Sequence, residues 1–98
     1  MNLEQLYRQY KETSIEGRYI ILEDIYPILE KLNTNKQLEI IGKSALDIPI
    51  YKFQIGTGKI KILLWSQMHG NESTTTKALI DFLNFLNGGS LLAKKFLK

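Results

Sequence analysis

The chain has 98 residues, 44% of them hydrophobic and 23% charged, which fits one small folded domain and excludes a disordered segment or two independent domains. Its net charge of +3 is too small to indicate nucleic-acid binding, and the absence of cysteine excludes disulfides, thiolate zinc ligands and cysteine nucleophiles. A metal site would therefore need histidine or carboxylate ligands. Because the sequence contains neither a signal-peptide pattern nor an apolar run of about 20 residues, we expect a cytoplasmic protein that does not insert into a membrane.

Two short amphipathic helices are predicted near the N-terminus. Residues 3–10 and residues 25–32 both carry apolar side chains at helical spacing. Asp24 is the predicted N-cap of the second helix, which makes Pro27 its third residue, where a missing N–H is tolerated. The cluster of asparagine and threonine at residues 33–35 is expected to end it.

Three strands are predicted in the middle of the chain. Residues 38–41 are strand-like, and residues 48–55 alternate with a period of two, with Pro49 near the start of that strand. A glycine-containing turn then leads into residues 60–65, whose second half is apolar at every position. Such a run is typical of a strand buried on both faces, so we expect residues 61–66 to form the centre of the sheet.

A loop and two helices are predicted to follow. A broad apolar stripe at residues 78–86 predicts a helix that opens at residues 73–75 and ends at residues 87–89. The hydroxyl side chains at its start are interpreted as helix caps, and Trp65 as a core residue. Residues 90–98 are expected to form a second short helix with a basic end.

His69 and Glu72 lie in the loop after the predicted central strand. Ligands of open α/β sheets bind beyond the carboxyl ends of strands, and an imidazole and a carboxylate three residues apart can converge on one Zn²⁺ ion. Taken alone, the pattern also fits a loop histidine bonded to backbone and an acid near a helix N-terminus. Catalytic zinc commonly has two histidine ligands and one glutamate, and this chain supplies two of these three residues.

Residues 60–79, with the sequence IKILLWSQMHGNESTTTKAL, resemble the first zinc-binding segment of the carboxypeptidase A/B-like zinc metallocarboxypeptidases. Residues 42–44 and 49–51 look like the hairpin that leads into the same strand in that family. The resemblance is clearest over residues 38–87. It departs from the family pattern at Asp47 and Ile48, where many members have Gly-Arg.

The resemblance implies the N-terminal portion of an α/β/α fold with a mixed sheet and flanking helices. Residues 1–36 would form a helical segment, and residues 37–98 the start of a catalytic domain. It also implies that His69 and Glu72 are zinc ligands in an enzyme that hydrolyses C-terminal peptide bonds with a zinc-activated water. Members bring a second histidine, substrate-binding asparagine, arginine and tyrosine residues, and a glutamate base from further downstream, and no position here matches them. We therefore expect a fragment, inactive alone, with no catalytic residue besides the metal ligands.

Two alternatives remain open from the sequence. The aspartoacylase and succinylglutamate desuccinylase type of zinc amidohydrolase has the same His-Gly-x-Glu start. A metal-free α/β interaction module could instead bury a partner or a second copy on its N-terminal helices and on the face formed by Phe82, Phe85 and Leu86. In a fragment, an unpaired sheet edge would also favour self-association, whereas a peptide substrate is expected only for a full-length relative.

Overall fold

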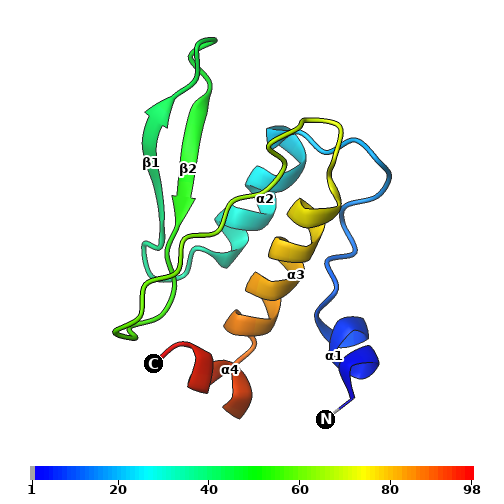
Figure 1. Ribbon diagram of the computed structural model, residues 1–98, viewed down its shortest axis with the longest axis vertical. Helices are drawn as coiled ribbons and strands as arrows, with labels where there is room; N and C mark the ends of the chain where they lie inside the picture. Colours follow the sequence, from blue (N-terminus) through cyan, green and yellow to red (C-terminus); the bar gives the residue numbers. More distant parts are fainter. Residues whose placement is uncertain (1) are drawn as a thin grey trace.

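The computed structural model describes residues 2–98 and combines helices with one small sheet (Figure 1). In chain order the elements are α1 (Leu3–Tyr10), α2 (Leu22–Leu32), β1 (Leu38–Lys43), β2 (Pro49–Phe53), α3 (Thr74–Asn87) and α4 (Leu91–Phe96). The prediction that the chain contains both α and β structure is therefore confirmed. None of these helices combines the length and apolar content needed to cross a membrane.

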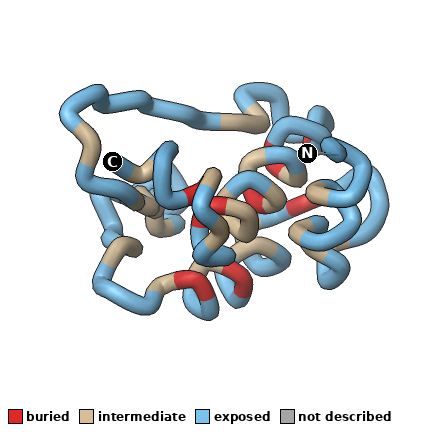
Figure 2. The backbone as a smooth tube through the Cα atoms, turned by 90° about the horizontal axis from the view of Figure 1, so that it is seen from below, coloured by how far each residue is buried: buried red, intermediate tan, exposed pale blue. Residues whose placement is uncertain are grey.

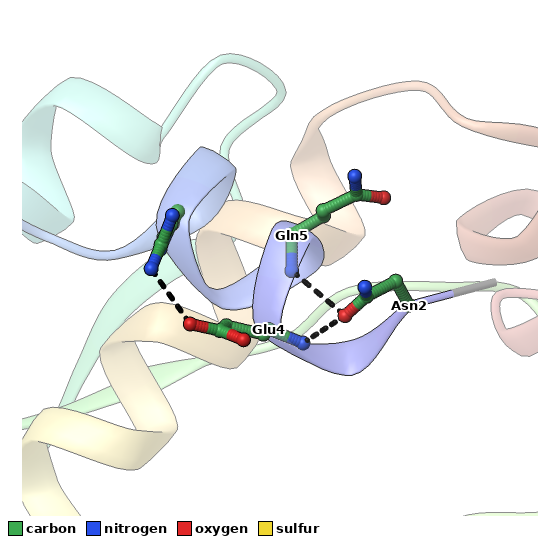
Figure 3. Close-up of polar contacts among 4 residues, drawn as sticks. Asn2, Glu4 and Gln5 are labelled. Atoms are coloured by element: carbon green, nitrogen blue, oxygen red, sulfur yellow. Dashed lines mark hydrogen bonds and ion pairs between the residues drawn. The ribbon is translucent and has the colours of Figure 1, made fainter.

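Helix α1 spans the residues predicted for it and is capped by a local side chain. The Asn2 side-chain oxygen accepts hydrogen bonds from the backbone N–H groups of Glu4, at 2.9 Å, and Gln5, at 3.3 Å (Figure 3). The Arg8 guanidinium contacts the Glu4 carboxylate one turn earlier, at 2.6 Å. The two Asn2 hydrogen bonds satisfy N–H groups that have no partner inside the helix.

Helix α2 begins three residues earlier than predicted. Its N-cap is Ile21, and Asp24 lies in the first turn, where its carboxylate accepts a hydrogen bond from the Ile21 N–H at 2.9 Å. The prediction that Asp24 is the N-cap is therefore wrong, although its side chain does stabilise the helix start. Pro27 consequently lies inside the helix rather than in its first turn.

Strands β1 and β2 form an antiparallel hairpin, with an irregularity between Ile40 and Gly42. In the connecting turn the Ser44 hydroxyl accepts the backbone N–H groups of Leu46 and Ile48, at 3.3 and 3.2 Å. Asp47 adopts a left-handed conformation with φ 64°, which aspartate tolerates better than most residues. Within residues 2–98 this two-stranded hairpin is the only sheet, so the expected mixed sheet is not present in these residues.

The core lies between α2 and α3. Ile28, Leu32 and Ile80 form a buried cluster, against which further partly buried side chains pack, namely Ile15, Ile25, Phe53 and Leu83. Figure 2 shows how small the buried part is compared with the exposed chain around it. Because this cluster draws on both residues 1–36 and residues 37–98, the two predicted segments share one core.

The prediction that residues 61–66 form the central strand is wrong for this structure. The stretch is extended but belongs to no sheet, and Trp65 is 66% exposed, so the interpretation of Trp65 as a core residue is also wrong. A strand buried on both faces needs neighbours on both edges, and β1 and β2 pair only with each other. The loop after β2 is bonded to the residue that follows α4, because the Thr57 N–H donates to the Leu97 carbonyl at 2.6 Å.

Helices α3 and α4 confirm the two helices predicted for the last third of the chain. The aromatic face of α3 is used inside the molecule, since Phe85 contacts the rings of Tyr10 and Phe96 at centroid distances of 5.5 and 6.2 Å. Phe82 also contacts Phe96, and Leu86 is buried. The face considered above as a partner-binding surface is thus largely occupied by α1 and α4.

Candidate metal centre

His69 and Glu72 lie at the two ends of a tight turn just before α3. The Glu72 N–H donates to the His69 carbonyl at 2.9 Å, which closes the turn. The turn brings the side chains together, with His69 Nδ1 3.4 Å from Glu72 Oε2. Both side chains are about 70% exposed, at 71% and 70%, so their nitrogen and oxygen atoms are open to solvent and to a ligand.

The separation of these two atoms matches that of two ligands on one zinc ion. With a Zn–N bond of about 2.0–2.1 Å, a Zn–O bond of about 2.0–2.2 Å and a tetrahedral angle, neighbouring ligand atoms lie about 3.4 Å apart. The observed distance is the same. This distance is also long for a direct hydrogen bond, so the two side chains do not bind tightly to each other in place of a metal ion.

The described residues bring no third ligand to this pair. Within residues 2–98 no group of three or more histidine, cysteine, aspartate or glutamate side chains is arranged to hold a metal ion. Two surface hollows of about 460 and 510 Å³ are found elsewhere, and neither His69 nor Glu72 lines them. Within the described residues, the arrangement can therefore supply two ligands of a metal ion.

Gln67 anchors the loop that carries the pair. Its side-chain amide donates to the backbone carbonyls of Ile20, at 2.8 Å, and Gly70, at 3.0 Å, while its carbonyl accepts the Thr76 hydroxyl at 2.7 Å. Gln67 has a left-handed backbone with φ 56°, an unfavourable conformation that these contacts stabilise. Sequence reasoning missed this residue, because its partner Ile20 is 47 positions away.

The hydroxyl side chains at the start of α3 have a different role from the predicted one. Ser73 occupies the N-cap position but makes no cap hydrogen bond, and its hydroxyl donates instead to the Arg18 carbonyl at 2.5 Å. The Thr76 hydroxyl is 2.7 Å from that of Ser66 as well as from Gln67. The capping interpretation is therefore wrong for Ser73, since these groups connect the loop to the segment before α2 and to α3.

Comparisons with protein families, with curated proteins and with solved structures gave no match to this chain.

Proposed function

We propose that His69 and Glu72 are two ligands of a zinc centre in a hydrolase of the zinc metallocarboxypeptidase type. The observation that carries this proposal is the 3.4 Å separation of His69 Nδ1 and Glu72 Oε2, on a loop that exposes both atoms. The resemblance of residues 60–79 to the first zinc-binding segment of that family supports the same assignment.

In this proposal each residue has a limited role. His69 supplies a neutral imidazole nitrogen and Glu72 a carboxylate oxygen, so Glu72 is a metal ligand and not the general base. Gln67 is a positioning residue, because its three hydrogen bonds fix the turn between the two ligands. Bound zinc would polarise a carbonyl group and lower the pKa of its water. The remaining ligand and the base have no counterpart near the pair in the described residues, so we expect no hydrolysis by this chain alone.

Residues 69–72 also resemble a second type of zinc enzyme, which has the same metal chemistry and a different substrate. The aspartoacylase and succinylglutamate desuccinylase amidohydrolases share the His-Gly-x-Glu pattern seen at residues 69–72. Peptide and small acylated substrates are distinguished by side chains around the metal, whereas both members of this pair are about 70% exposed. We propose the carboxypeptidase type because the hairpin residues 42–44 and 49–51 also resemble that family.

Calorimetric titration with zinc chloride tests the assignment. We expect weak binding at one site in the wild type, because two protein ligands leave half of a tetrahedral shell to water. His69→Ala should abolish the binding, and Glu72→Gln should weaken it by roughly tenfold or more, since a neutral amide oxygen is a poorer ligand than a carboxylate. Glu16→Gln is the matched control, because Glu16 is equally an exposed glutamate but lies outside the pair.

Identical isotherms for the wild type and His69→Ala would contradict the proposal. They would identify the pair as a weak surface contact between a histidine and a glutamate. A loss of binding in Glu16→Gln as large as that in Glu72→Gln would show nonspecific binding to carboxylates and would contradict it as well.

A further inference from the structure

Residues 60–65 form an exposed apolar segment that pairs with no strand of the described chain. The five large apolar side chains of this segment are between 55% and 84% exposed, namely Ile60, Ile62, Leu63, Leu64 and Trp65. Figure 1 shows the segment as an extended stretch between the β1–β2 hairpin and α3. Within residues 2–98, none of its backbone N–H or C=O groups takes part in a hydrogen bond.

These features indicate what kind of partner the segment can bind. An extended backbone with free N–H and C=O groups is satisfied by another strand, whereas a helix has no free backbone groups to offer along its length. Apolar side chains on both sides of the segment favour a partner strand that is itself apolar. The 60–65 segment of a second copy has both properties.

We infer that two copies of this chain pair through residues 60–65 as antiparallel strands, related by a two-fold axis at Leu63. Such an axis is perpendicular to the shared sheet, so residues opposite each other lie on the same face and have positions of the same parity. This register places Leu63 opposite Leu63, and Ile62 opposite Leu64.

Charge favours an antiparallel pair over a parallel one. A parallel in-register pair would place Lys59 and Lys61 of one copy beside the same lysines of the other, at a strand spacing of about 4.8 Å, which is unfavourable. In the antiparallel register Lys61 lies opposite Trp65, where a lysine ammonium can contact the face of the indole ring. Shifting the axis to Ile62 would place Lys59 opposite Trp65 and Lys61 opposite Leu63, so that Lys61 would face an aliphatic side chain instead of the indole ring.

The size of the contact predicts a reversible dimer. A strand of six residues is about 20 Å long and forms an interface at or below the low end of specific complexes, near 1,200 Å². We expect a dissociation constant of roughly 10–100 μM, a range typical of weak complexes. Sedimentation over about 5–200 μM should therefore show a shift from monomer to dimer.

Substitutions at two leucines of similar exposure test whether the segment forms the dimer. Leu63 is 79% exposed and Leu46, in the hairpin turn, is 82% exposed. Leu63→Lys places two charges opposite each other at the axis and should raise the dissociation constant at least tenfold, while Leu46→Lys should leave it unchanged. Circular dichroism confirms that both variants are folded. A wild type that stays monomeric at about 200 μM, or forms open-ended polymers, would overturn the inference.

Disulfide trapping tests the register, because the wild-type chain has no cysteine. Leu63→Cys should give a covalent dimer on mild oxidation, since both cysteines lie at the axis. Ile60→Cys should not, because the two cysteines would be about 20 Å apart along the strands. Efficient trapping of Ile60→Cys would indicate a parallel pair, and preferential trapping of Ile62→Cys an axis at Ile62. Either result would overturn the register. Slow hydrogen exchange at residues 60–65 in a monomer would indicate pairing within one chain and would overturn the dimer.

Discussion

Truncation of Ile80 and of Leu63 should affect stability very differently. Ile80 is 3% exposed and packs with Ile28 and Leu32 between α2 and α3. Removing its outer carbons in Ile80→Ala leaves a cavity, so the expected loss in the free energy of unfolding is about 2–5 kcal/mol. Leu63 is only about one-fifth buried, so Leu63→Ala should cost roughly 0.3–0.6 kcal/mol of the 1.5–3 kcal/mol that full burial contributes.

Urea denaturation followed by far-ultraviolet circular dichroism measures both effects. A concentration of about 2 μM keeps the protein below the dissociation constant expected for the dimer. If the free energy of unfolding falls by about 1.2 kcal/mol per M urea, a loss of about 3 kcal/mol in Ile80→Ala lowers the urea midpoint by about 2.5 M. If the wild type is stable by only about 3 kcal/mol, Ile80→Ala is unfolded in buffer. Leu63→Ala should lower the urea midpoint by about 0.5 M or less. Equal losses in the two variants would refute this description, because residues 60–65 would then be part of the core.

Three further predictions follow from individual contacts. Trp65 is the single tryptophan and is 66% exposed, so at low protein concentration its fluorescence should have the emission maximum of a solvent-exposed indole and be readily quenched by acrylamide. Blue-shifted, unquenched emission would mean that Trp65 is buried. Asn84→Ala should lower the free energy of unfolding by about 1–1.5 kcal/mol relative to Asn87→Ala, because the Asn84 amide donates to the Tyr10 carbonyl and to the Glu12 carboxylate; equal values would contradict this. The Ser14 hydroxyl holds the pKa of the Glu12 carboxyl below its ordinary value of 4.5. The ionised Glu12 carboxylate should therefore stabilise the fold above pH 4.5, and this contribution should be lost as the pH falls through the folded-state pKa. Glu12→Gln should remove that part of the pH dependence of stability in acid titrations.

The helices and the hairpin could be predicted because their signals are local. Apolar side chains three and four residues apart identified α1 and α3, and alternation identified the second strand of the hairpin. The start of α2 was missed because an aspartate that accepts the Ile21 N–H from the third helical position resembles an N-cap in sequence.

The behaviour of residues 60–65 could not be predicted from their own pattern. A continuous apolar run indicates a strand that can be buried on both faces, but burial depends on neighbours that the run does not specify. Here the loop after β2 is bonded to Leu97, 40 positions away from Thr57, and the segment remains outside the hairpin.

The candidate site could also be predicted only in part. The three-residue spacing indicated that His69 and Glu72 could meet, whereas the anchoring of their loop by Gln67 depends on Ile20 and Thr76.

The most direct test of the proposed zinc centre is a nitrogen NMR titration of the His69 ring. His69 is the only histidine, so its two ring nitrogen signals are identified without further variants. Added zinc should shift the Nδ1 signal towards that of a metal-bound nitrogen and saturate, with a much smaller shift at equal zinc in Glu72→Gln, because Nδ1 is the ring atom that lies 3.4 Å from the Glu72 carboxylate. Ring signals that stay unchanged up to about 1 mM zinc, or that respond equally in Glu72→Gln, would contradict the proposal that these two residues bind one metal ion.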